Sequence, residues 1–458
     1  MDNEKYRIEK DTLGEVKIPA SALWGPQTER SRQNFKIGQR MPFEIIESLL
    51  QIKKAAAVVN KKNGEISKEK SDLIVEAVDQ LLVGKYQDAF PLVVYQTGSG
   101  TQTNMNVNEV IVHLAAKINP KVSLQANDDV NHSQSSNDTF PTAMAIAAYD
   151  AVKKLLSVLE HLENSLNDKA LEFKNIVKIG RTHLQDATPI TFGQEISGWS
   201  SQIKHNFDYL QNNKKTLLEL PIGGTAVGTG LNTVKDFDRQ MVEQLSVQKG
   251  ISYLVAPNKF QGLAAHSAIN FIHGIFKTLA ADLVKIGNDI RFLASGPRSG
   301  YGEINIPANE PGSSIMPGKI NPTQIEALTM VAARVMGNDT TIDFSSSQGN
   351  FEMNVYKPII IQSFLESAKL LTEAIGSVDK NLIQGITVNQ KRMKDLVDNS
   401  LMTVTALSPH IGYEKSAKIA QKALRENTKL IDATLASGYV TEKEFREWVD
   451  PFKMTSHK

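Results

Sequence analysis

Apolar residues recur at helical spacing over unusually long stretches of this chain. Between Thr139 and Leu171 an apolar side chain returns every three or four residues, with Pro141 near the start and no glycine behind it. This pattern predicts a single helix of about 30 residues, or about 45 Å. Similar patterns predict long helices over 192–219, 262–294, 324–337 and 358–376, and helices near 42–61 and 67–83.

Helices of this length with broad apolar faces usually pack into a bundle, and association of subunits is a natural way to cover such faces. No stretch with a period of two is long enough for a large sheet, so the predicted fold class is mainly α, with a central bundle of long helices. We expect three domains: a mixed and helical N-terminal domain over 1–134, the long-helix bundle over 135–357, and a small helical C-terminal domain over 358–458.

The charge balance limits the classes of partner. The 51 Lys and Arg residues nearly cancel the 50 Asp and Glu residues, which leaves a formal charge of +1. We therefore expect no nucleic-acid partner and no membrane partner, and any preference for anions must be local. The first residues resemble neither a signal peptide nor a presequence, and no apolar run is long enough to span a bilayer, so we expect a cytoplasmic protein.

The chain contains no cysteine, which excludes disulfides, thiolate nucleophiles, Cys-ligated zinc and Cys-ligated iron–sulfur clusters. The nine histidines are scattered without the spacing of a metal site. We therefore expect neither a metal nor another cofactor.

The segment 312–322, Gly-Ser-Ser-Ile-Met-Pro-Gly-Lys-Ile-Asn-Pro, cannot form a helix, because glycines and prolines interrupt it. It should be a loop with exposed N–H groups that also carries hydroxyls, an ammonium and a carboxamide. Such a loop could bind an anion, although the same composition is also typical of a surface turn.

Three more loops are dense in hydroxyl and amide groups: 96–106, 131–138 and 180–187. The first two precede helical stretches, so their N–H groups could receive a carboxylate or could simply cap a helix. His183 lies in the third loop, where a catalytic role and a structural role both remain open. Glu326 follows the 312–322 loop, where a carboxylate is commonly a partner of the helix dipole.

The stretch 312–328 closely resembles the signature of the fumarase/aspartase superfamily, whose members eliminate across a C–N or C–O bond to release fumarate. Thr97-Gly-Ser-Gly-Thr-Gln102, the stretch 180–189 and the stretch 223–232 match the family in the same order, and the similarity covers nearly the whole chain. Ser135-Ser-Asn137 and Pro317-Gly-Lys319 resemble class II fumarases rather than aspartases. Class I fumarases hold an iron–sulfur cluster through cysteine, which this chain lacks.

The resemblance implies reversible hydration of fumarate to (S)-malate, a step of the tricarboxylic acid cycle, without a cofactor. It implies that Ser313 removes the carbon-bound proton and that His183, oriented by Glu326, exchanges a proton with the departing hydroxide or attacking water through a bound water. It also implies a homotetramer with active sites shared between subunits. The substrate-binding residues carried over from the family are Ser99, Gly100, Thr101, Ser135, Ser136, Asn137, Thr182, Ser314, Lys319, Ile320 and Asn321.

One segment departs from the family. Class II fumarases commonly have His-Pro-Asn-Asp in a second, non-catalytic anion site, whereas this chain has Gln125, Ala126, Asn127 and Asp128. With Gln125 where the histidine is expected, we do not expect dicarboxylate affinity there.

Two alternatives remain at this point. An ammonia-lyase similar to aspartase would use the same loop and the same carbanion with an amine leaving group. A catalytically silent helical scaffold would keep the fold without the reaction, although all the expected loop residues are present together.

Overall fold

The computed structural model describes residues 6–456, and it is mainly helical, as predicted. The described chain divides into two compact units that interleave along the sequence. Unit 1 comprises residues 1–156, 209–278 and 333–371, and unit 2 comprises 157–208, 279–332 and 372–458. This division is of a different kind from the three consecutive domains predicted above, whose boundaries stay a prediction.

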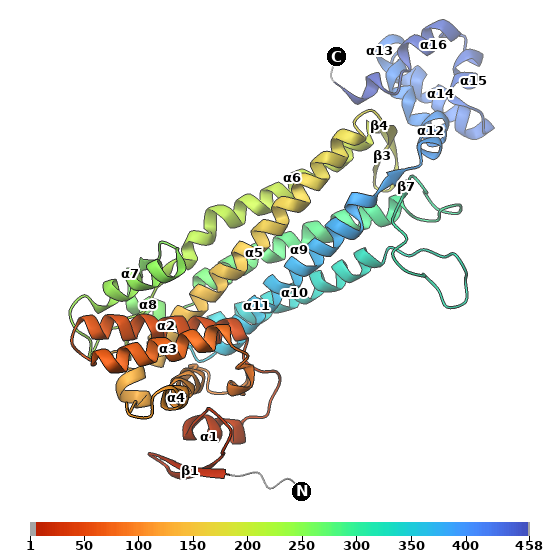
Figure 1. Cartoon of the computed structure of the whole chain (residues 1–458). Helices are drawn as coiled ribbons and strands as arrows, with labels where there is room; N and C mark the ends of the chain where they lie inside the picture. The colour runs from red at the N-terminus through yellow and green to blue at the C-terminus, as the bar shows by residue number, and fades with distance from the viewer. Residues whose placement is uncertain (1–5, 457–458) are drawn as a thin grey trace. The chain divides into compact units, whose positions relative to one another are not determined.

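Five long helices contribute stretches to both units (Figure 1). They are α5 (Ser136–Glu172), α6 (Phe192–Asn213), α9 (Ser267–Leu293), α10 (Thr323–Ser347) and α11 (Lys357–Asn381). The predicted helices are therefore present, with four differences at their ends. The segment before α9 forms a separate short helix, α8 (Lys259–Ala264), and α6 ends six residues earlier than predicted. Helix α10 continues past Gly337, and α11 ends five residues later than predicted.

The start of α5 also differs from the prediction. The helix begins at Ser136, so Pro141 is its sixth residue rather than a member of the first turn. The earlier start has a local cause, because the Ser135 side chain accepts a hydrogen bond from the backbone N–H of Asn137 at 3.2 Å. Capping of this kind satisfies a donor that the first turn of a helix leaves without a partner.

Unit 1 also contains the N-terminal helices and two small sheets. Helices α2 and α3 pack against each other and against α4, and α7 packs against α2. The strands β1 and β2 are antiparallel, and β5 and β6 are parallel. The bounds are β1 (Tyr6–Asp11), β2 (Gly14–Pro19), α1 (Pro26–Asn34), α2 (Phe43–Lys62), α3 (Lys68–Val83), α4 (Thr101–Ile118), β5 (Glu219–Leu220), α7 (Phe237–Lys249) and β6 (Leu254–Val255).

A buried polar network joins three of the long helices within unit 1. His273 of α9 is fully buried, and its two ring nitrogens lie 2.9 Å from a carboxylate oxygen of Asp339 in α10 and 2.8 Å from the Ser367 hydroxyl in α11. Asn338 donates to the same hydroxyl at 3.0 Å. These bonds fix the register of the three helices and give His273 a structural role.

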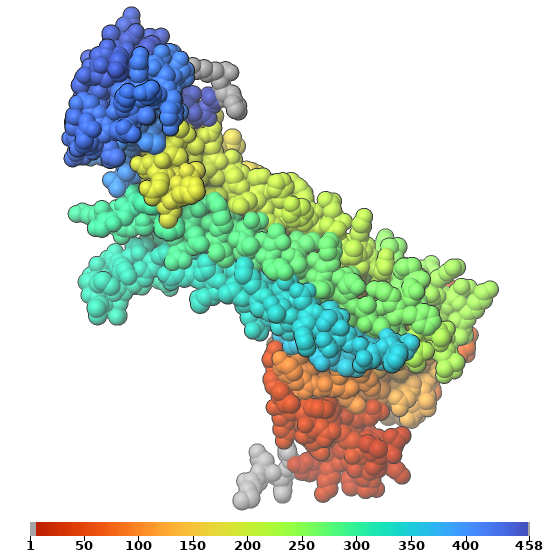
Figure 2. Space-filling model, turned by 180° about the vertical axis from the view of Figure 1, so that it is seen from behind, coloured from red at the N-terminus to blue at the C-terminus, as the bar shows by residue number. Residues whose placement is uncertain are grey.

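The outer faces of α9 and α10 in unit 1 carry large apolar side chains that are open to solvent. Phe271 is 53% exposed and Phe344 is 61% exposed. The α10 stretch, cyan in Figure 2, lies at the surface on the face shown there. An apolar surface of this kind is typical of a contact with another protein chain.

Unit 2 contains an antiparallel hairpin and the C-terminal helices. The hairpin strands are β3 (Val177–Thr182) and β4 (Gln185–Thr191), and β3 packs against α12. The C-terminal helices surround a small apolar core that includes Leu407, Ile419 and Leu430. The remaining bounds are β7 (Ile304–Asn305), β8 (Thr387–Val388), α12 (Gln390–Asn399), α13 (Ser408–Ile411), α14 (Tyr413–Glu426), α15 (Leu430–Ala436) and α16 (Glu442–Trp448).

Side-chain hydrogen bonds between helices also stabilise unit 2. Ser200 of α6 donates to Asn167 of α5 at 2.6 Å, and the Trp199 indole donates to Asp289 of α9 at 3.1 Å. None of the described helices is long and apolar enough to cross a membrane.

Candidate active site

Hydroxyl groups from two predicted loops meet at the start of two helices in unit 1. The Ser99 and Thr101 hydroxyl oxygens are 2.7 Å apart, and the Thr101 and Ser136 hydroxyl oxygens are also 2.7 Å apart. Thr101 is the first residue of α4, and Ser136 is the first residue of α5. We call Ser99, Thr101 and Ser136 the hydroxyl chain.

Gly100 makes the close approach of these loops sterically allowed. Its φ is +81°, in the left-handed region, and a Cβ there would lie 2.3 Å from the Phe140 ring. Any larger residue would therefore push the α4 start away from α5. The N–H groups at a helix start carry partial positive charge, so two such starts beside three hydroxyls form a suitable receptor for a carboxylate.

Asp138 holds the loop at 131–138 in place through hydrogen bonds to backbone N–H groups. It is fully buried, and its carboxylate accepts hydrogen bonds from the backbone N–H groups of Ser135 at 3.0 Å, Gly223 at 2.9 Å and Thr225 at 2.9 Å. Burial raises the pKa of Asp138, while the three N–H donors act in the opposite direction. Asn137 connects the same two segments by donating to the Ala226 carbonyl at 2.7 Å. The loop at 135–137 is therefore rigidly held against the segment 223–226.

Lys53 of α2 holds the other end of this loop. Its side chain is fully buried, and its ammonium donates to the amide oxygens of Asn131 and Gln134, both at 2.9 Å. Burial lowers the pKa of Lys53 to about 7, although nearby Asp138 counteracts the shift. Sequence reasoning missed both Lys53 and Asp138. The available signal for Lys53 was its helical spacing from Leu49, Leu50 and Ala57, which places it on the apolar face of its helix.

Ser313 lies in a loop that is closed on itself in unit 2. Its hydroxyl oxygen accepts hydrogen bonds from two backbone N–H groups, those of Ile315 at 3.2 Å and Met316 at 3.0 Å. The N–H of Gly312 donates to the Lys319 carbonyl at 2.9 Å, which closes the loop. Two N–H donors directed at one hydroxyl would stabilise the negative charge of the alkoxide.

Glycine and asparagine brace this loop. A Cβ on Gly312 would lie 2.4 Å from the Lys319 carbonyl oxygen, so the closed form requires glycine there. The Asn321 amide donates to the Gly312 carbonyl at 2.7 Å. Asn321 thus has an observed structural contact in addition to its predicted role as a substrate donor. The next residue, Ser314, is exposed.

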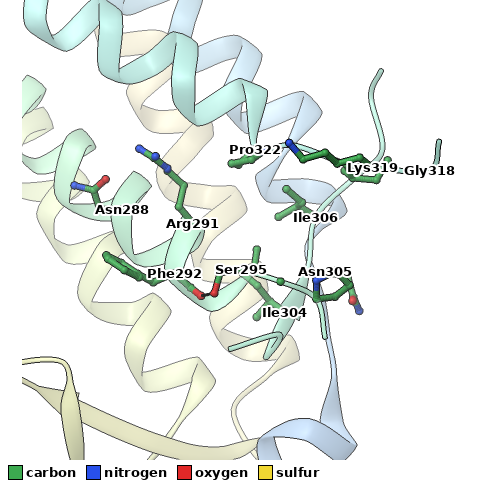
Figure 3. Close-up of a pocket in the computed structure, with 14 residues that line it drawn as sticks. Asn288, Arg291, Phe292, Ser295, Ile304, Asn305, Ile306, Gly318, Lys319 and Pro322 are labelled. Carbon is green, nitrogen blue, oxygen red and sulfur yellow. Dashed lines mark hydrogen bonds between the residues drawn. The ribbon is translucent and has the colours of Figure 1, made fainter. Parts of the chain in front are cut away.

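A cavity of about 580 Å³ lies between the loop and the end of α9. Figure 3 shows Lys319 from the loop and Arg291 from α9 on its walls, and Ile320 also lines it. Two cationic side chains on one cavity make the surroundings of this loop favourable for anions.

His183 lies at the tip of the β3–β4 hairpin. Thr182 pairs with Gln185, so His183 and Leu184 form a two-residue turn, and both have positive φ, +57° and +58°. All four residues are exposed. Glu326 occupies the first turn of α10, as predicted. Among the described residues, no hydrogen bond joins His183 to Glu326 or to Ser313, so their predicted cooperation stays a prediction.

The segment at the proposed second anion site forms a short π-helical turn, Ala126–Val130. Gln125, Asn127 and Asp128 are exposed. The nearest described ion pair uses Asp129, which lies 2.7 Å from the Lys70 ammonium. The expectation that this segment has no dicarboxylate affinity stays a prediction.

Comparison with known families places the chain in a class of lyases. Residues 14–337, more than half of the chain, match the family model described as lyase. Residues 404–456 match the family model described as the fumarase C C-terminus.

Individual relatives narrow the class. A fumarate hydratase class II from Listeria monocytogenes serotype 4b is 57% identical over 98% of this chain and 99% of the relative. One from Bacillus subtilis is 51% identical, with 99% and 100% of the two chains covered. A crystal structure of a class II fumarase from Schistosoma mansoni superposes with a TM-score of 0.96, at 41% identity, covering 98% of this chain and 99% of the other. The chain therefore belongs to the fumarate hydratase class II family, as the resemblance of its motifs predicts.

Proposed function

We propose that this protein catalyses the reversible hydration of fumarate to (S)-malate. The observation that carries the proposal is the position of the Ser313 hydroxyl, which accepts two backbone N–H groups. A free serine hydroxyl is a poor base. The two N–H donors would stabilise its alkoxide and so make Ser313 a better one. The names of the relatives at 51–57% identity support the same reaction.

In the proposed mechanism, the Ser313 alkoxide takes the proton from the carbon next to a malate carboxylate. The electron pair moves into that carboxylate and gives an aci-carboxylate dianion. The Lys319 ammonium and the second N–H of the Asn321 amide would stabilise this charge, and one preorganised donor of this sort contributes about 3–4 kcal/mol. The hydroxyl chain and the α4 and α5 starts would bind the substrate carboxylates, because these groups are already arranged as donors.

Loss of hydroxide requires a proton, which we assign to His183 and a bound water. Glu326 would orient the imidazole as a carboxylate partner does in other acid–base pairs. In the described chain these two side chains are not hydrogen-bonded to each other. We therefore propose that the pair forms between subunits when the protein assembles.

We further propose that the assembly is a homotetramer whose active sites are shared between subunits. The hydroxyl chain lies in unit 1, whereas His183, Ser313, Lys319 and Glu326 lie in unit 2. The exposed Phe271 and Phe344 on α9 and α10 give unit 1 an apolar surface for such association. Light scattering combined with size-exclusion chromatography tests this proposal, and a fully active monomer would contradict it.

One assay tests the reaction and its competitors together. Purified protein is mixed with (S)-malate or with L-aspartate, and the ultraviolet absorbance of fumarate is followed with and without a chelator. We expect fumarate from malate alone, without release of ammonia and without sensitivity to the chelator. Fumarate from aspartate would favour an ammonia-lyase, and no fumarate from either substrate would favour a silent scaffold.

We also propose a cytoplasmic location, which the balanced charge of the chain supports. Fractionation of cells followed by immunodetection tests it. Recovery of the protein in a membrane fraction would overturn it.

A further inference from the structure

The turn that carries His183 has an unfavourable backbone conformation for its residues. Positive φ at both central positions is the arrangement of a type I′ hairpin turn, which is usually formed by Asn-Gly. His183 and Leu184 both have a Cβ, and a left-handed conformation is strained for a leucine in particular. Leu184 is 58% exposed, so packing of its side chain does little to offset this strain.

The residues from 182 to 186 are exposed, and Arg181 is the last side chain before the turn that reaches the interior. Its guanidinium makes a two-pronged contact with Glu303, with distances of 2.9 Å and 3.2 Å to the two carboxylate oxygens. The guanidinium also lies over the Tyr301 ring, 4.5 Å from its centre. Bidentate pairs of this kind fix direction as well as distance.

Glu303 is itself firmly held. Its side chain is completely buried, its backbone N–H donates to the Leu293 carbonyl at 2.9 Å, and its carbonyl accepts from the N–H of Asn389 at 2.8 Å. The ammonium of Lys178, also on β3, lies 3.7 Å from the Glu303 carboxylate and 3.0 Å from that of Glu195. The positive charges of Arg181 and Lys178 therefore offset the negative charges of Glu303 and Glu195 beneath the hairpin. The backbone hydrogen bonds of Glu303 connect this cluster to the end of α9 and the start of α12.

We propose that Arg181 is a positioning residue for the reaction, which through Glu303 holds the strained His183–Leu184 turn in the conformation that presents the imidazole. The inference rests on the proposed function, because it takes His183 as the acid–base group. It assigns no contact with substrate to Arg181. The Arg181–Glu303 pair fixes the direction in which the hairpin tip points. Its interaction energy offsets the backbone strain at Leu184.

The first test compares Arg181→Met with Arg446→Met, since Arg446 makes an exposed pair with Glu442 in the same unit at 2.7 Å. We expect Arg181→Met to lower kcat about tenfold or more with KM changed less than about threefold, because a misplaced catalytic group loses rate rather than affinity. Arg446→Met should leave both constants unchanged. A kcat within about twofold of wild type for Arg181→Met would overturn the inference.

The second test relieves the strain instead of removing its support. Leu184→Gly places the residue that a type I′ turn favours at its second position. Added to Arg181→Met, it should restore most of the lost kcat, which a general structural role of Arg181 would not allow. If the change in kcat of the double variant is simply the product of the changes in the two single variants, Arg181 does not act by holding the turn.

Hydrogen exchange of the amides in 182–187 provides a measurement that does not depend on turnover. Arg181→Met should speed exchange there, and Leu184→Gly should reverse the change. If Arg181→Met does not fold, Glu303→Gln keeps the shape of the acceptor without its charge, and the same pattern is expected from it. Wild-type protein without activity would overturn the proposed function and the catalytic part of the inference, whereas unchanged exchange in an active enzyme would overturn the inference alone.

Discussion

The two regions that hold the candidate residues differ in how their polar groups are supported. In unit 1, the hydroxyl chain lies at two helix starts and is backed by buried Asp138 and Lys53, so its geometry is set before any ligand arrives. In unit 2, His183 and Ser313 lie on exposed segments that are held by a few hydrogen bonds. In the proposed mechanism, substrate binding therefore relies on rigid helix ends, and the proton transfers rely on segments that closure or assembly would complete.

The largest effect should come from removing the acid–base group. We expect His183→Asn to lower kcat by about 10³-fold, within the range that general acid–base groups contribute. Because His183 is exposed, the thermal unfolding midpoint should stay near that of wild type. The measurement is fumarate absorbance together with a melting curve. His161→Asn, at an exposed site on α5, is the control, and a His183→Asn variant with wild-type turnover would remove His183 from the mechanism.

The next effect separates two adjacent serines. Ser313→Ala should lower kcat by about 10²-fold or more, because the two backbone N–H groups lose the oxygen that they stabilise. Ser314→Ala should act mainly on KM, since its hydroxyl has no such donors. Steady-state kinetics of the two variants distinguishes the roles. Equal losses of kcat would mean that the loop, and not the Ser313 oxygen, is what matters.

The fold was largely predictable from the sequence, because apolar spacing that continues over stretches such as 139–171 and 262–294 leaves few alternatives to a long helix. Helix ends were less predictable. Taken alone, Gly337 predicts the end of a helix. Helix α10 nevertheless continues through it, because Ile342 beyond it is fully buried. Tertiary packing here overrides the low helix propensity of glycine.

The four polar segments could be named as candidate sites because glycine, hydroxyl and amide residues coincide in them, and their roles stay a prediction. Their local structure was predicted less well, since 180–187 lies largely in the β3–β4 hairpin and not in a loop. Their supports could not be predicted, since each depends on residues far apart in the sequence. Lys53 reaches Asn131, and Arg181 reaches Glu303, across separations that no local pattern reveals. The strain at Leu184 could not be inferred either, because the sequence His-Leu gives no sign of a turn that usually contains Asn-Gly.

A smaller effect tests the hydroxyl chain of unit 1. Thr101→Val keeps the shape of the side chain and removes the oxygen that lies between Ser99 and Ser136. We expect KM for malate to rise about tenfold and kcat to change less than about threefold, because one hydrogen bond to a charged ligand is lost. Thr428→Val, at an exposed site in unit 2, is the control. A large fall in kcat with unchanged KM would place Thr101 in the chemistry and remove the contrast between the two regions.

The smallest effect concerns the rigid support itself and appears in the pH dependence of stability. The folded-state pKa of Lys53 is about 7, whereas a lysine in an unfolded chain has a pKa near 10.4. Between these values the unfolded state binds more protons than the folded state, so Lys53 makes the free energy of unfolding rise with pH. The slope from one such group is at most about 1.4 kcal/mol per pH unit.

Lys53→Met should therefore flatten the rise in stability between pH 7 and pH 10, measured by denaturant unfolding at a fixed protein concentration. Part of the slope should remain, because burial also lowers the pKa of Lys357, to about 8. Lys54→Met is the matched control, since the Lys54 ammonium pairs with Asp79 at the surface. An unchanged slope in Lys53→Met would mean that Lys53 stays charged when buried, held by Asn131, Gln134 and nearby Asp138. The support of the 131–138 loop would then be a cation throughout the range from pH 7 to pH 10.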